Sequence, residues 1–74
     1  MLLSDLGVGE CAKIVRIDCK QTIAGRLRRM GLTENASISV IRKALFGDPI
    51  ELKLRDFCLA IRKSVAKTIT VEKL

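Results

Sequence analysis

The apolar residues of this chain change their spacing twice within 74 residues. Residues 50–55 alternate strictly between apolar and charged side chains, which is typical of a strand with one buried face. Ile23, Leu27 and Met30 instead follow the spacing of one helix face. One helix is therefore predicted inside an otherwise strand-forming sequence.

Five short strands are expected, at residues 11–18, 36–40, 50–55, 57–61 and 69–71. Their inward-facing side chains are predicted to be Ala12, Ile14, Ile17, Ala36, Ile38, Val40, Ile50, Leu52, Leu54, Phe57, Leu59, Ile61, Ile69 and Val71. The inward spacing in the first strand changes from two to three, which predicts a bulge near Val15 and Arg16. A chain this short with five strands favours a mainly β fold, a small closed barrel, because closure removes exposed sheet edges.

Local signals predict where the helical segments begin and end. Thr22 is a candidate N-cap for the helix that follows the first strand. Gly31 can adopt the left-handed conformation that ends this helix, and Leu32 can fold back onto its last turn. Ser64 is expected to cap a short helical turn that runs through Lys67 before the last strand.

The charge of the chain suggests its partners and its lack of histidine disfavours catalysis. Fourteen Lys and Arg against eight Asp and Glu give a formal charge of +6, which attracts phosphate, acidic protein or anionic lipid. Only Phe46 and Phe57 are aromatic, so nucleic-acid binding by base stacking is not expected. Without histidine the chain has no imidazole base or nucleophile activator, and an enzyme is not predicted.

Two groups of residues stand out as candidates for contact with a partner protein. Three arginines near the end of the predicted helix either complement its dipole or dock a partner. Two apolar residues beside the Gly47–Pro49 turn either fold back over an open barrel end or present a contact. Leu27, the apolar helix residue between the arginines, is included with them. The candidate partner-binding residues are Arg26, Leu27, Arg28, Arg29, Leu45 and Phe46.

The metal-ligating residues form no recognisable motif. The three cysteines include no C-x-x-C pair and their spacing does not indicate a disulfide framework. A structural zinc site normally needs four ligands with regular spacing, so cysteines in the core or on the surface are the simpler interpretation. The weak candidates for a low-affinity divalent transition metal are Asp48, Glu51, Cys58 and Glu72.

The longest apolar run, Phe57 to Ile61, is too short to cross a bilayer. The sequence does not begin with the basic segment and long apolar stretch of a secretory signal. A cytoplasmic location is therefore expected.

Several motifs in a fixed order resemble the FeoA family. They are Leu3-x-x-Leu6-x-x-Gly9, Ala12-x-Ile14, Arg26-Leu27-x-x-Met30-Gly31-Leu32, Gly47-Asp48-Pro49-Ile50 and Leu59-x-Ile61-Arg62, and the match runs from Leu3 to Glu72. One position departs from the family pattern, because Asn35 stands where a glycine is usual. Asn is the residue next most tolerant of positive φ, so the turn is expected to survive.

This resemblance implies a single SH3-like barrel domain over residues 1–74. It further implies a non-catalytic cytoplasmic accessory of ferrous iron uptake, held at the inner face of the membrane by its partner. That partner is the membrane transporter FeoB, whose transport or nucleotide turnover the chain would modulate. Two alternatives stay open: a metal-binding module similar to the C-terminal domain of iron-dependent repressors, and a small basic RNA-binding barrel. Weak self-association is also compatible with the sequence.

Overall fold

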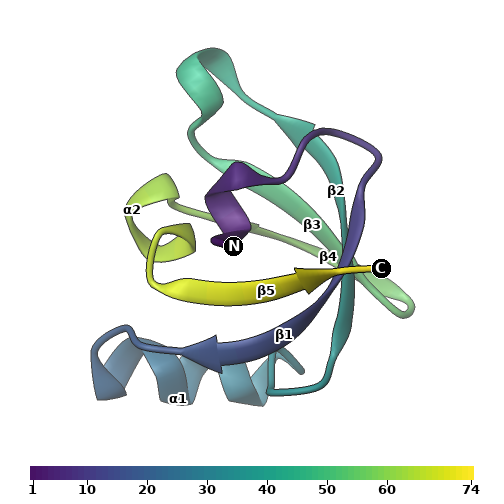
Figure 1. The fold of residues 1–74 in the computed structure, drawn as a ribbon. Helices are drawn as coiled ribbons and strands as arrows, with labels where there is room; N and C mark the ends of the chain where they lie inside the picture. The colour runs from purple at the N-terminus through teal and green to yellow at the C-terminus, as the bar shows by residue number, and fades with distance from the viewer.

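The computed structural model describes residues 1–74 and contains five strands and two α-helices (Figure 1). The elements in chain order are the 3₁₀ turn η1 (Leu3–Asp5), β1 (Cys11–Ile17), α1 (Gln21–Arg29), β2 (Ser37–Lys43), the 3₁₀ turn η2 (Leu45–Gly47), β3 (Ile50–Leu54), β4 (Phe57–Ile61), α2 (Lys63–Ala66) and β5 (Ile69–Lys73). The predicted mainly β fold, with one helix after the first strand and a helical turn before the last, is confirmed. No helix has both the length and the apolar character needed to span a membrane.

The five strands form one antiparallel sheet in the order β4-β3-β2-β1-β5. The sheet bends round the core, as Figure 1 shows, but no strand pairing joins β4 to β5. The chain passes between these two end strands through α2, which lies against η1. Hydrogen-bonded closure of the predicted barrel is therefore absent, and buried side chains of these two short elements complete the core.

The core consists of apolar side chains from every strand, both helices and the N-terminal turn. All sixteen buried residues are apolar, and fifteen of them form one cluster. Most predicted inward positions are buried or packed against this cluster. Phe57 is the exception, with 43% of its surface exposed. Phe57 begins β4, an end strand of the sheet, which pairs with β3 on one side only.

Two strand pairs contain irregularities that change which face a residue occupies. The β1–β5 register shifts between Ile14 and Arg16, which confirms the predicted bulge. The β2–β3 register shifts in the same way between Val40 and Arg42. Val15 and Ile41, the residues that follow these buried positions, lie exposed, and the register shift places the next residue, Arg16 or Arg42, on the exposed side as well.

Helix α1 ends as predicted but begins differently. Gly31 has φ +94°, and the Leu32 N–H donates to the Leu27 carbonyl at 2.9 Å, as in a Schellman ending. The helix starts at Gln21 with no side-chain cap, so the prediction of Thr22 as N-cap is wrong. Thr22 lies within the first turn, because the chain enters the helix directly after Lys20.

Helix α2 donates a hydrogen bond from its first residue to a distant loop. The predicted cap Ser64 is wrong, because it is the second residue of the helix. Instead the Asp48 Oδ1 atom accepts the Lys63 N–H at 3.0 Å. A carboxylate at a helix start satisfies a free donor and complements the helix dipole. Asp48 thus ties the β2–β3 connection to α2.

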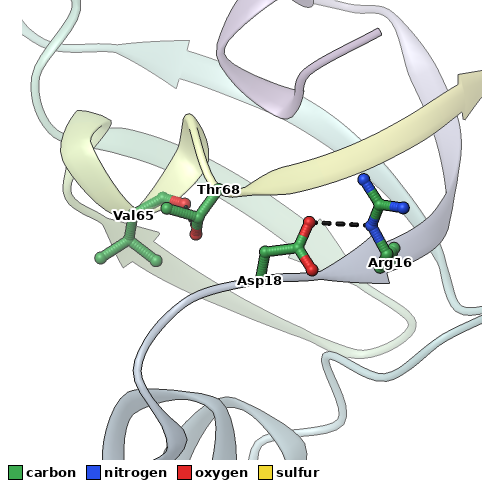
Figure 2. A network of polar contacts seen from close by, with 4 residues as sticks. All are labelled: Arg16, Asp18, Val65 and Thr68. Carbon is green, nitrogen blue, oxygen red and sulfur yellow. Dashed lines mark hydrogen bonds and ion pairs between the residues drawn. The ribbon is translucent and has the colours of Figure 1, made fainter.

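A second polar connection ties the end of β1 to the turn between α2 and β5 (Figure 2). The Asp18 N–H donates to the Thr68 carbonyl at 2.8 Å, and the Thr68 hydroxyl donates to the Val65 carbonyl at 2.6 Å. Arg16 Nε lies 2.8 Å from Asp18 Oδ2. Both charged side chains face solvent, so this ion pair contributes little to stability. The backbone bond extends the β1–β5 pairing by one position beyond Ile17 and Ile69.

Candidate functional site

The predicted partner-binding residues lie at two ends of the molecule. In Figure 1, α1 lies at the bottom and the β2–β3 connection with η2 at the top. The three arginines of α1 and the Leu45–Phe46 pair therefore form two surfaces rather than one. Leu27 belongs to neither, because it is 3% exposed and packs in the core beneath the arginines.

A groove of about 770 Å³ lies between the end of α1 and the β3–β4 hairpin. We call it the helix–hairpin groove, and the lining residues used below are Arg29, Met30, Glu34, Asn35, Arg55 and Phe57. Of the predicted arginines only Arg29 lines it; Arg26 and Arg28 lie elsewhere on the same helix. The groove is the larger of two hollows in the structure.

Backbone turns fix the shape of the helix–hairpin groove. A Cβ atom on Gly31 would lie 3.9 Å from Phe57 Cε1, so the helix ending and the aromatic ring are close neighbours. Asn35 has φ +71°, which confirms that Asn supports the positive-φ turn expected of this position. Its N–H donates to the Ile14 carbonyl at 2.7 Å, which anchors the α1–β2 loop to the sheet. Arg55 turns the hairpin with φ +46°.

The groove carries excess positive charge beside a half-exposed aromatic ring. Arg29 and Arg55 line it, and no ion pair in the structure includes either side chain. Glu34 is its one carboxylate. Unpaired guanidinium groups form strong bidentate hydrogen bonds with carboxylates, and an exposed Phe offers apolar contact area. The groove therefore suits an acidic segment of another protein that also carries an apolar side chain.

Sequence reasoning missed Arg55 and Phe57 as groove residues. Phe57 fitted the inward alternation of its predicted strand, and Arg55 was interpreted as one of three outward charged residues of the predicted strand 50–55. Strands at residues 50–55 and 57–61 were predicted, but not that the turn between them brings both side chains opposite the end of α1.

The Leu45–Phe46 pair is fully presented to solvent. Leu45 is 79% exposed and Phe46 88% exposed, so the interpretation that they fold back over a barrel end is wrong. The core is already filled by residues of the N-terminal segment and α2, including Leu3, Leu6 and Ala66. The Ala44–Pro49 turn therefore carries its apolar residues outward.

The weak candidate metal ligands do not come together. Asp48 accepts the Lys63 N–H, and Glu51 forms an ion pair with Arg42. Cys58 and Glu72 are exposed on β4 and β5, the two ends of the sheet. No three Cys, Asp or Glu side chains are grouped closely enough to hold an ion. All three cysteines are free thiols.

One carboxyl group has a perturbed pKa. Glu10 accepts a hydrogen bond from Lys73 and another from the Gly7 N–H, and these bonds lower its pKa below the usual value of 4.5. The ammonium of Lys43 lowers it further. Glu10 thus stays ionised while it joins the turn before β1 to the end of β5.

Comparison with known proteins identifies relatives over nearly the whole chain. The FeoA domain family matches residues 1–73. An Fe(2+) transport protein A/Fe(2+) transporter FeoB fusion protein of Porphyromonas gingivalis is 32% identical over 72 residues, which are 97% of this chain and 8% of the relative. This chain therefore corresponds to a small part of that fusion. An Fe(2+) transport protein A of Campylobacter jejuni is 31% identical over 71 residues, 96% of each chain.

Solved structures share both sequence and fold with this chain. The FeoA protein of Chlorobium tepidum superposes with a TM-score of 0.96 at 35% identity, covering all of this chain and 70% of that one. A zinc complex of Stenotrophomonas maltophilia FeoA, described as an SH3 domain protein, gives 0.83 at 26% identity over 97% and 89% of the two chains. A manganese-dependent transcriptional repressor shares the fold, with a TM-score of 0.88 at 17% identity, all of this chain and 41% of that one. The motif order, the SH3-like fold and these matches together place this chain in the FeoA family, a family of Fe(2+) transport.

Proposed function

We propose that this chain is a single-domain, non-catalytic cytoplasmic accessory of ferrous iron uptake that binds the transporter FeoB. The observation that carries the proposal is the P. gingivalis relative, in which an FeoA segment and FeoB are parts of one polypeptide. Fusion of two proteins in one species favours physical association of their separate counterparts in another. The absence of histidine supports a binding role rather than an enzymatic one.

The helix–hairpin groove is the proposed docking site. Its two unpaired arginines attract acidic segments, and Phe57 and Met30 add apolar contact beside them. Arginine and aromatic residues are the types that most often dominate binding energy at interfaces. An acidic cytoplasmic segment of FeoB is the expected occupant.

The proposed action of the bound chain is a shift in conformational populations. A partner that binds one conformation of FeoB more tightly than another favours that conformation by the difference in binding free energy. Transport or nucleotide turnover would change accordingly, with no chemical step carried out by this chain.

The decisive experiment measures binding of the full-length chain to detergent-solubilised FeoB from the same organism. Replacing Arg29 and Arg55 together by Glu is expected to weaken binding by about tenfold or more, because charge reversal turns attraction into repulsion at the site. Arg16→Glu combined with Arg28→Glu is the matched control, since it makes the same change in net charge away from the groove.

Both double variants must retain the circular dichroism and unfolding midpoint of the wild type. Equal binding by the groove variant and the control would remove the groove from the interface. Failure of the wild type to bind FeoB at all would overturn the proposed function.

A further inference from the structure

The β2–β3 connection presents an apolar tip that neither the core nor the groove uses. Leu45 and Phe46 are the two most exposed large apolar residues of the chain. Neither hollow of the structure is lined by any residue from 41 to 49. The tip is therefore a protrusion, which can enter a deformable medium without a preformed socket.

The tip has a defined conformation. The Gly47 N–H donates to the Ala44 carbonyl at 2.8 Å, and the Ala44 N–H donates to the Pro49 carbonyl at 3.0 Å. Phe46 has φ +61°, a conformation that bulky residues rarely adopt. These bonds fix the turn that carries both apolar side chains outward, so little ordering is needed when the tip binds.

Cations surround the base of the tip. Residues 42–51 and 62–63 carry four cations and two carboxylates. A Cβ atom on Gly47 would lie 3.9 Å from Lys63 Nζ, which places that ammonium beside the turn. Both carboxylates are engaged by arginines: Asp48, which also accepts the Lys63 N–H, lies 4.0 Å from Arg62 Nε, and Glu51 pairs with Arg42. Lys43 adds charge next to η1, where its Nζ lies 3.4 Å from the Ser4 carbonyl oxygen.

Two further exposed apolar residues lie at the same end of the molecule. Ile41 is 41% exposed where β2 leads into the loop, and Val8 is 62% exposed. The Gly9 N–H donates to the Val40 carbonyl at 2.8 Å, so the turn that carries Val8 runs beside this part of β2 (Figure 1).

We propose that the Leu45–Phe46 tip inserts into the interfacial region of an anionic lipid bilayer, with Lys43 and Lys63 contacting the headgroups. An apolar protrusion with a cationic base matches both layers of such a surface, because acyl chains accept the apolar side chains and anionic headgroups attract the cations. This contact is separate from FeoB binding and needs no FeoB. It would hold the helix–hairpin groove, at the other end of the molecule, toward the aqueous side.

The absence of Trp and Tyr makes the test direct. Phe46→Trp introduces a single fluorescent side chain at the tip, which we call the tip probe. Phe57→Trp introduces the matched side chain at the groove, the groove probe. On addition of phosphatidylglycerol-rich vesicles, emission of the tip probe is expected to shift to the blue and to be quenched by brominated acyl chains, while emission of the groove probe stays unchanged. Vesicles of phosphatidylcholine alone, or high salt, should reduce the response.

Affinity measured by vesicle flotation provides the second readout. Phe46→Asn keeps a residue that tolerates positive φ and is expected to lower vesicle affinity about tenfold, because an inserted apolar side chain is lost. Lys63→Gln should lower it about fivefold, the effect of one cation near a charged bilayer. Lys20→Gln, the same charge change before α1, should have a clearly smaller effect.

Three results would overturn the proposal. The first is unshifted emission of the tip probe in the presence of anionic vesicles. The second is an equal response of the tip and groove probes, or of Lys63→Gln and Lys20→Gln, since either equality would mean unoriented attraction. The third is a blue shift of the tip probe that depends on protein concentration without lipid, which would assign the tip to self-association.

Discussion

The two ends of this small domain present opposite kinds of surface. The helix–hairpin groove is concave, and the helix ending beside it is anchored in the core by Leu27 and Leu32. The Leu45–Phe46 tip is convex, apolar and held by the hydrogen bonds of its own turn and by Asp48. The first depends on the core for its shape and the second hardly does. A chain of 74 residues can thus carry a concave binding site and a protruding binding site on different parts of its surface.

The largest expected effect comes from the same substitution made at both ends. Leu27→Ala should lower the free energy of unfolding by about 3 kcal/mol, because it leaves a cavity beneath the groove. Leu45→Ala should change it by less than about 0.5 kcal/mol, because the side chain is already in water. Urea unfolding followed by circular dichroism measures both. Comparable losses would show that the tip is part of the folding core.

A smaller effect is expected from the carboxylate that joins the tip to α2. Asp48→Ala should lower the free energy of unfolding by about 1 kcal/mol, because the Lys63 N–H loses its acceptor. Asp48→Asn keeps an acceptor oxygen and should recover part of the loss. Hydrogen exchange of the Lys63 amide provides the local readout, and unchanged protection in Asp48→Ala would mean that the turn alone holds this end.

The smallest expected effect depends on pH. The pKa of Glu10 is lower in the folded chain than its usual value of 4.5, so its contribution to stability is complete above that pH. The contribution is lost as the pH falls through the lowered pKa. Glu10→Gln should therefore have a slightly lower urea midpoint than the wild type at neutral pH, and the difference should vanish in strong acid. A difference that persists at low pH would point to packing rather than charge.

Most of the fold could be predicted because its signals are local. Alternation located the strands, and the change of spacing located α1 and the β1 bulge. Gly31 and Leu32 marked the helix end, since left-handed glycine followed by an apolar residue has few other uses. The caps were mispredicted for a physical reason. The first residue of α2 bonds to Asp48, fifteen positions earlier in the chain, and no pattern near Ser64 could indicate that partner.

The candidate site was less predictable because it depends on tertiary proximity. Arg29 was identified, but its groove neighbours Arg55 and Phe57 come from the β3–β4 hairpin, which lies far along the chain beyond β2. Leu45 and Phe46 were identified as apolar residues near a turn, and whether they fold inward depends on how much of the core other segments fill. The core volume that other segments fill depends on the whole chain and cannot be predicted from the residues near one turn.

The two bulges have a consequence for how the strands find each other. In β1 and β2 the same sequence of buried and exposed positions repeats, and each strand loses its regular register just after its second buried residue. A slip of β2 by one residue would turn Ile38 and Val40 to water and would also misplace the irregularity against β3. The bulges therefore disfavour a slipped alignment, so that a short sheet of similar apolar strands has one register that satisfies both its alternation and its irregularities.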